Sequence, residues 1–347
     1  MIRVTTNGLL NSYRYNLMKS TISRNEAMTT VLTQRNFNSY AEDPAAAAQA
    51  FQLRRSFLRT DSQITVSESV VRKFESAWSA LDSIVADIDN GTTGSAWESV
   101  LEAANDPTGG GRNALGTQLT QLADNIVQSL NTRYGDSFIF AGADGLNVPF
   151  TWEEQADGSR VLLYRGVAVD TGDLDQLNAM ANEKKYVDIG LGLQEDENGN
   201  LIESSAFNEA LSGLNFLGYG VDDDGDPKNV VSIIQKMGSL LSNCDADGNW
   251  ANAADGEEYM RLAQKLEAAA DNLKTKHVEM DTQASFLKDN QTRLESDAYT
   301  LNEQIMGIEQ CDPALAISNL SWAQYCYNAA LRMGNSVLSQ SLMDYLD

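Results

Sequence analysis

The chain is 347 residues long, with 49 acidic against 25 basic side chains and a formal net charge of −24. This excess of negative charge excludes a general nucleic-acid binder, which needs lysine and arginine to neutralise phosphates. One histidine and three scattered cysteines leave few residues for metal or nucleophile chemistry, so we expect neither an enzyme nor a cofactor. No apolar run has the length of a membrane span, and we expect no membrane partner.

The first 42 residues predict a helix with one apolar face, on which Leu10, Tyr13 and Leu17 recur at helical spacing. The opening residues have no apolar core of the length that a cleavable signal peptide needs, so we expect no such signal. A second helix start follows at Asp43-Pro44, because Asp is a good N-cap and Pro is tolerated at the first helical position.

Residues 43–143 predict the N-terminal half of a long helical bundle. Apolar side chains recur every seventh position from Phe57 to Val85, which is the pattern of a coiled-coil seam. A further helix is predicted from Leu115 to Leu130, where apolar side chains again follow helical spacing. Together these segments provide two helices with apolar faces that need a partner.

Residues 144–256 differ in charge and in turn chemistry. The stretch 146–256 holds 20 acidic and 6 basic side chains, a net charge of −14. Asp-Gly and Asn-Gly dipeptides, which favour hairpin turns, occur six times between residues 144 and 256. Short β-type runs at 161–164 and 186–189, with one helix at about 227–241, predict a small inserted α+β domain that faces solvent.

Residues 257–311 predict the C-terminal half of the bundle as one helix of about 50 residues, or ~75 Å. A large apolar residue recurs every seventh position and forms the expected bundle seam. This seam consists of Leu266, Leu273, Met280, Leu287, Leu294, Leu301 and Ile308.

Residues 312–347 repeat the N-terminal design, since Asp312-Pro313 starts a helix with one apolar face. Two helices cannot hide both of their apolar faces in a monomer, so we expect other subunits to cover these surfaces. The expected assembly residues are Leu10, Tyr13, Leu17, Leu320, Tyr327, Leu331, Leu338 and Tyr345.

The predicted fold class is therefore mainly α: a long antiparallel helical bundle or coiled coil built from both chain ends, with an inserted small, β-rich α+β domain. The predicted division has five parts. They are an N-terminal assembly helix (1–42), two bundle halves (43–143 and 257–311), the acidic outer domain between them (144–256) and a C-terminal assembly helix (312–347).

Several short motifs at both ends of the chain carry a resemblance to a known family. They are Thr5-Thr-Asn-Gly-Leu-Leu-Asn11, Asp43-Pro-Ala-Ala-Ala47, Phe138-Ile-Phe-Ala-Gly142, Tyr164-Arg-Gly166, Asp312-Pro-Ala-Leu-Ala-Ile-Ser-Asn-Leu320 and Ser341-Leu-Met-Asp-Tyr-Leu346. With these motifs in this order along the chain, the sequence resembles the flagellin superfamily and, within it, the hook-filament junction proteins. The likeness covers both flanks, about two thirds of the chain.

The resemblance implies a structural role in the bacterial flagellum: an extracellular adaptor that joins hook to filament by self-assembly of its terminal helices. It implies a helical ring of copies, another hook-associated protein on the hook side and flagellin on the filament side. A cytosolic chaperone and the flagellar export apparatus would handle the chain before assembly. Two alternatives stay open, namely flagellin itself and an unrelated coiled-coil surface or virion protein. The segment Thr33–Pro44 fits the junction proteins better than flagellin.

Two sharper interpretations of single residues are less favoured. The loop with Asn243, Asp245 and Asp247 matches the start of a calcium loop, but Ala254 stands where the bidentate Glu belongs, so a solvated turn is the better interpretation. His277 lies on the companion row of the bundle seam, which favours a packed ring over a catalytic base.

Overall fold

The computed structural model describes residues 6–89, 94–105, 111–156, 158–245 and 247–343. The fold is mainly helical, with short antiparallel strands, which confirms the predicted class. The chain divides into two compact units: residues 1–61 with 295–347, and residues 62–294. Two long helices, α2 (Pro44–Ile88) and α8 (Ala253–Glu309), contribute to both units.

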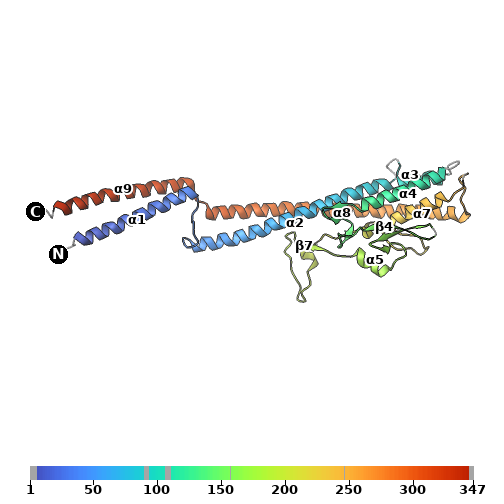
Figure 1. Ribbon diagram of the computed structural model, residues 1–347, viewed down its shortest axis with the longest axis horizontal. Coiled ribbons are helices and arrows are strands. Elements are labelled where there is room, and N and C mark those ends of the chain that lie inside the picture. Colours follow the sequence, from blue (N-terminus) through green and yellow to red (C-terminus); the bar gives the residue numbers. More distant parts are fainter. Residues whose placement is uncertain (1–5, 90–93, 106–110, 157, 246, 344–347) are drawn as a thin grey trace. The chain divides into compact units, whose positions relative to one another are not determined.

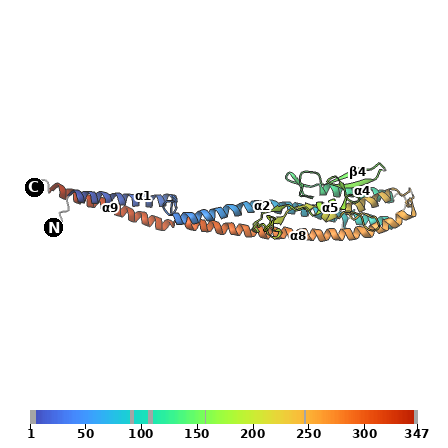
Figure 2. The ribbon, with the colours of Figure 1, turned by 90° about the horizontal axis from the view of Figure 1, so that it is seen from below.

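The first unit contains the two terminal helices, α1 (Thr6–Thr33) and α9 (Pro313–Met343). They lie side by side and antiparallel, as Figures 1 and 2 show from two directions. Asp43 Oδ1 accepts hydrogen bonds from the backbone N–H groups of the first turn of α2, and Asp312 Oδ1 does so for α9. These contacts confirm the two predicted Asp-Pro helix starts.

The two links between long helices pair with each other in this unit. Asn36 N donates to Glu309 O over 2.7 Å, and Cys311 N donates to Gln34 O over 3.1 Å. The Asn36 side chain donates two further hydrogen bonds, to the carbonyl oxygen of Ile308 at the end of α8 and to that of Gln310 in the link after it. The link between α1 and α2 is thus hydrogen-bonded to the chain segment that joins α8 to α9.

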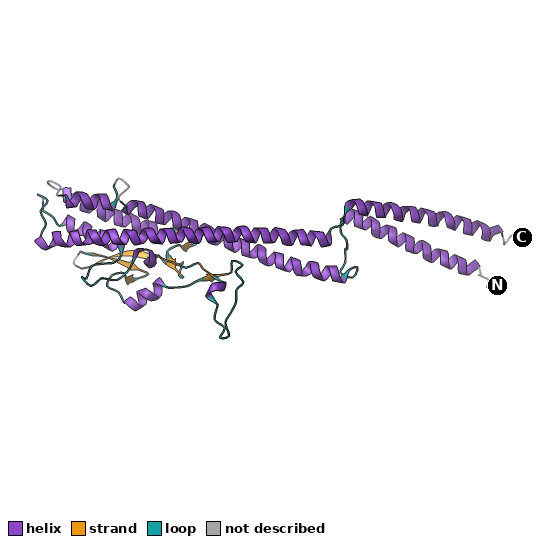
Figure 3. Cartoon of the chain, turned by 180° about the vertical axis from the view of Figure 1, so that it is seen from behind, coloured by secondary structure: helices purple, strands orange, loops and turns teal. Residues whose placement is uncertain are grey.

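The second unit packs the helices against the inserted strands around one core. Two short helices, α3 (Ala96–Ala104) and α4 (Gly111–Leu130), continue the bundle, and α7 (Val230–Ser242) packs along α4. Figure 3 shows the strands gathered beside these helices. Phe74, Leu119, Phe140, Leu162 and Val231 come from helices and insert alike, and all belong to one buried cluster.

Within the described part of the chain the strands form four small antiparallel sheets. The largest joins β4 (Phe150–Glu154), β5 (Arg160–Tyr164) and β6 (Val167–Ala168), in which Phe150 pairs with Tyr164 and Tyr164 with Val167. The two-stranded sheets join β1 (Arg133–Tyr134) to β2 (Ser137–Phe138), β3 (Ala141–Gly142) to β9 (Leu211–Ser212), and β7 (Tyr186–Val187) to β8 (Phe207–Asn208). Short helices α5 (Leu174–Ala181), η1 (Glu203–Ser205) and α6 (Gly213–Leu217) connect them.

One sequence motif is explained by the turn between β5 and β6. Arg165 and Gly166 have positive φ angles of 51° and 84°, as a two-residue hairpin with mirror-image turn geometry requires. Arg165 Nη1 donates to both carboxylate oxygens of Glu183 at 2.8 Å, which holds this strained residue in place.

The insert differs from the expected separate module. Its β structure begins at Arg133, upstream of the predicted boundary at 144, and it shares its core with α2, α4 and α8. Helix α7, predicted from turn-rich sequence as part of an outer domain, packs on the bundle helix α4. The short apolar runs of the insert are too small to bury themselves alone, so they close the core of the second unit.

The crossing of α4 and α7 depends on two glycines. A Cβ atom on Gly116 would lie 2.7 Å from the carbonyl oxygen of Gly238, and one on Gly238 would lie 2.8 Å from Thr120 Oγ1. We expect Gly116→Ala to lower the free energy of unfolding by about 1–3 kcal/mol, because overpacking outweighs the gain in helix propensity. Thermal unfolding followed by circular dichroism checks this.

Gly307→Ala is the matched control, because Gly307 also lies inside a helix but has no atom within 4 Å of the added Cβ. It should raise stability by up to about 1 kcal/mol. Equal effects of the two substitutions would show that the α4–α7 contact is not close-packed.

A buried carboxyl group in the same unit predicts a pH dependence. Burial raises the pKa of Asp170 from its usual value near 3.8 to about 6, and the nearby Ser232 hydroxyl and Lys236 ammonium offset this only partly. Its Oδ1 is buried without a hydrogen-bond partner. The folded state therefore favours the protonated carboxyl, so folding loses stability as the pH rises from 4 towards 7.

We expect Asp170→Asn to raise the free energy of unfolding by about 2 kcal/mol at neutral pH, because the amide carries no charge to desolvate. The gain should shrink towards pH 4, where the native carboxyl is protonated as well. Urea unfolding at both pH values checks this, with Asp136→Asn, an exposed carboxyl in the same unit, as control. A pH-independent gain would contradict the assignment.

Candidate assembly surface

The seam between α1 and α9 combines small residues on α9 with larger ones on α1. On α9, Ala316, Ala323 and Gly334 are buried, and Leu320 and Tyr327 lie between them at steps of three and four residues. Small residues allow two helices to approach closely. A Cβ atom on Gly334 would lie 2.0 Å from the hydroxyl oxygen of Tyr13, so this position accepts only glycine unless the tyrosine moves.

Polar contacts secure the same seam. The Arg24 guanidinium lies 4.4 Å from the centroid of the Tyr327 ring, a cation–π contact between the two helices. The Cys311 thiol lies 3.8 Å from the carbonyl oxygen of Thr30. The two helices are thereby paired along most of their described length.

The structure places the predicted assembly residues in two groups. Leu10, Tyr13, Leu17, Leu320 and Tyr327 are half-buried, and their spacing puts them on the faces that α1 and α9 turn to each other. The partner helix of the same chain covers much of these five side chains, and their contact with other subunits stays a prediction.

The remaining three predicted assembly residues differ from these. Leu331 is 42% exposed and lies outside the seam. Leu338 is within α9, but its side chain lies outside the described residues, as does Tyr345 altogether. For these two positions the assembly role stays a prediction.

A second apolar row, which the sequence analysis missed, faces away from the seam. We call it the outer stripe. Trp322, 67% exposed, stacks on Tyr325 with ring centroids 5.7 Å apart. Large apolar residues at the surface of both helices make this row a candidate interaction site. The outer stripe comprises Tyr15, Met18, Ile22 and Leu32 of α1 with Leu315, Trp322, Tyr325 and Met333 of α9.

The signal for the outer stripe is in the sequence, because Tyr15, Met18 and Ile22 of α1 and Leu315, Trp322 and Tyr325 of α9 recur at steps of three, four or seven residues. Tyr15, Met18 and Ile22 follow the same spacing as Leu10, Tyr13 and Leu17. Each terminal helix thus carries two apolar rows, one for its partner in the chain and one left uncovered in the monomer.

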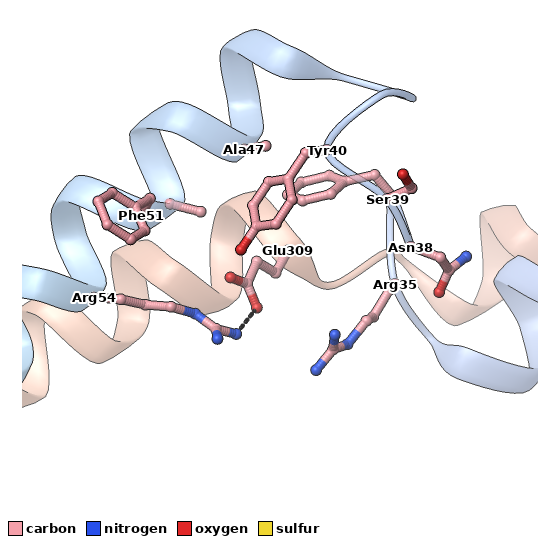
Figure 4. Close-up of a pocket in the computed structure, with 10 residues that line it drawn as sticks. Arg35, Asn38, Ser39, Tyr40, Ala47, Phe51, Arg54 and Glu309 are labelled. Atoms are coloured by element: carbon pink, nitrogen blue, oxygen red, sulfur yellow. Dashed lines mark hydrogen bonds and ion pairs between the residues drawn. The ribbon is translucent and has the colours of Figure 1, made fainter.

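A small pocket lies where the links meet α2 (Figure 4). Its volume is about 140 Å³, and its lining includes Arg35, Tyr40, Phe51, Arg54 and Glu309. Arg54 Nη2 lies 2.5 Å from Glu309 Oε2, an ion pair that joins the start of α2 to the end of α8. The pocket has aromatic and charged walls but no nucleophile–base arrangement, so its chemistry favours packing rather than reaction.

The predicted bundle seam lies on α8. In the second unit Leu266, Leu273, Met280, Leu287 and Leu294 are all at most 2% exposed. In the first unit the last two members of the row, Leu301 and Ile308, are half-buried. The seam is therefore buried most deeply where the insert adds a third layer to the bundle.

The acidic insert is held to α8 by a network of ion pairs around Asp226, which is 1% exposed. Arg261 Nε lies 2.6 Å from Asp226 Oδ2, and Lys265 and Lys236 lie within 3.1 Å of the same carboxylate. The Arg261 guanidinium, with the two lysines, holds the pKa of Asp226 far below its usual range. The stabilisation from this network is present at neutral pH and is lost as the pH falls below 4.

We expect Asp226→Asn to lower the free energy of unfolding at pH 7 by about 3 kcal/mol, because three cations lose their buried partner. The difference from the native chain should shrink in acid, because below about pH 4 the unfolded chain binds a proton at this carboxyl that the folded chain does not bind. Urea unfolding at pH 7 and pH 3 tests this, and Asp223→Asn, an exposed neighbour, should change little. An equal loss at both pH values would contradict the ionic origin.

The calcium alternative can be examined at three turns of one design. Asp196, Asp222 and Asp245 each accept, through Oδ1, backbone N–H groups two and four residues later. The glycine three residues on has a φ between 78° and 86° in each turn. These carboxylates cap their own turns, as the solvated-turn interpretation expects.

At one of these turns three carboxylates come together. The oxygens of Asp222, Asp224 and Asp226 lie within 4.8 Å of one another, but Lys265 Nζ contacts all three at 2.6, 2.9 and 2.6 Å. A lysine ammonium thus already lies among the three carboxylates, which explains the grouping as an ion-pair network.

His277 packs as the sequence interpretation favours. Its ring stacks on Trp78 with centroids 5.0 Å apart, and Nε2 is buried without a hydrogen-bond partner, 4.0 Å from Asp82 Oδ1. All three cysteines are free thiols. Across the described helices, no segment has both the length and the apolar character to span a membrane.

Comparison with known proteins finds similarity to solved structures. No protein-family model and no curated protein matches the chain. The chain is similar to a putative flagellar hook-associated protein from Vibrio parahaemolyticus, with 16% identity and a TM-score of 0.49; the match covers 77% of this chain and 99% of that one.

Two further solved structures are similar. For FlgL of Bacillus cereus the identity is 16% and the TM-score 0.44, covering 74% of this chain and 99% of that one. For flagellar hook-associated protein 3 of Legionella pneumophila the identity is 13% and the TM-score 0.47; the match covers 73% of this chain and 98% of that one. The chain is thus similar to flagellar hook-associated proteins from several species.

Proposed function

We propose that this chain is a structural subunit of the bacterial flagellum that joins hook to filament by assembly of its terminal helices. The outer stripe is the observation that carries the proposal. It exposes aromatic and aliphatic side chains on a helix pair that is already closed along its inner seam, so it is available for contact with other subunits.

The flanking motifs support the same role. The Asp-Pro starts at Asp43 and Asp312 open a long helix after each link, and the chain ends carry the remaining pieces of the resemblance to hook-filament junction proteins. The segment Thr33–Pro44 favours a junction protein over the filament subunit itself. Electron microscopy of the purified chain distinguishes the two, because a filament subunit should polymerise alone into long filaments.

Partners and location follow from this proposal. The chain would work outside the cell, in a ring of its own copies between another hook-associated protein and flagellin. It would leave through the flagellar export apparatus. Before export, exposed side chains such as Trp322 and Tyr325 would need a cytosolic chaperone to cover them, because they are apolar and accessible in the monomer.

Substitution of Leu331 tests the proposal. In cells whose own copy is deleted, Leu331→Asp should abolish filament attachment, because a carboxylate would be buried between subunits without a partner. The free chain should keep its stability within about 0.5 kcal/mol, since Leu331 faces water there. Microscopy of stained filaments and thermal unfolding of the purified chain measure the two effects.

Leu287→Asp is the control, because Leu287 is fully buried in the monomer. It should destabilise the purified chain by about 4 kcal/mol or more. Cells that carry Leu331→Asp and Trp322→Asp together and still swim with intact filaments would overturn the proposed role of the terminal helices.

A further inference from the structure

Two exposed faces of the first unit match each other in spacing and oppose each other in charge. On α2 the residues Phe51, Arg55 and Leu58 form what we call the basic face. On α8 the residues Tyr299, Glu303 and Met306 form the acidic face. Each face has an aromatic residue, then a charge four residues later, then an aliphatic residue three residues after that.

The apolar members of both faces are open to solvent. Phe51, Leu58, Tyr299 and Met306 have exposed fractions between 42 and 65%. Seven residues separate the two apolar positions on each helix, so they lie two turns apart on one side. Each face can therefore present both apolar side chains to one partner helix.

The charges at the centres of the faces lack opposite partners. Among the described residues Arg55 makes no hydrogen bond or ion pair, whereas its neighbour Arg54 is paired with Glu309. Glu303 accepts a hydrogen bond from the Tyr299 hydroxyl over 3.0 Å, and no cation contacts it within the described part of the chain. The Tyr299 contact holds the carboxylate on the acidic face without neutralising it.

The basic face also borders a hollow that an apolar side chain can enter. Tyr40, Pro44, Ala48, Phe51 and Arg55 line a surface depression of about 450 Å³. Its walls are mostly apolar, and it lies beside Phe51. Methionine is flexible enough to fill such an irregular space.

We propose that the basic face of one copy binds the acidic face of the next copy in the assembly. With the two helices antiparallel, Met306 lies opposite Phe51 and its hollow, Glu303 opposite Arg55, and Tyr299 opposite Leu58. A chain that carries both halves of a contact on different surfaces forms head-to-tail interfaces, which generate rings or helices. The inference rests on the proposed function and assigns a lateral contact outside the outer stripe.

A charge swap tests the pairing in the full-length chain, expressed in cells whose own copy is deleted. Arg55→Glu and Glu303→Arg should each lower the fraction of cells with attached filaments about tenfold or more, because like charges then face each other at every interface. The double variant, which restores opposite charges, should recover attachment. Lys228→Glu, an exposed basic residue of the second unit with the same change in charge, should have no effect.

Cross-linking tests the contact without changing either charge. Copies with Phe51→Cys and copies with Met306→Cys are expressed together, each with Cys311→Ser and Cys326→Ser. A short bismaleimide should then join the two kinds of copy in assembled flagella but not in the secreted monomer. No cross-link in the assembly, or a double charge variant no better than the single ones, would overturn the inference.

The outcomes separate this inference from the proposed function. If the native chain restores attached filaments and Leu331→Asp abolishes them, while the charge variants behave like the native chain, only the lateral contact is wrong. If the native chain itself restores no filament attachment, the proposed function fails.

Discussion

The pairing of apolar seams from opposite ends of the chain is the interaction on which the rest of the structure depends. In the first unit it joins α1 to α9 through small residues such as Ala316, Ala323 and Gly334. In the second unit α2 and α8 share a buried cluster that includes Phe74 and Leu287. A long helix is marginal alone, so its stability comes from the apolar face it buries.

This pairing does not by itself determine which apolar residues are buried and which remain exposed to solvent. A helix that buries one row against its partner still has room for a second row at the same spacing. On the terminal helices this second row is the outer stripe. On α8, by contrast, most residues on the side facing away from the seam are charged. Closure of the inner seam therefore presents the outer stripe on a paired, regular surface instead of on two independent helices.

The insert adds charge without loosening the fold, because its most buried carboxylate is neutralised by cations from α7 and α8. Asp226 meets Lys236, Arg261 and Lys265, and Lys265 also contacts the carboxylates beside it. Further carboxylates accept hydrogen bonds from the backbone N–H groups of their own turns. Much of the negative charge is left for the solvent-facing surface, where it favours solubility rather than a particular contact.

The sequence by itself determined the helices, their seams and their starts, because heptad spacing and Asp-Pro caps are local signals that extend over many turns. Turns such as Asp222–Asp226 could likewise be predicted from their own residues. Only the tertiary structure decided that α7 crosses α4 at two glycines, that the insert shares the bundle core, and that Leu10 and Tyr327 face inward while Trp322 faces out. Those outcomes depend on close approach and on which of two similar apolar rows is buried, and a periodic pattern alone does not distinguish the rows.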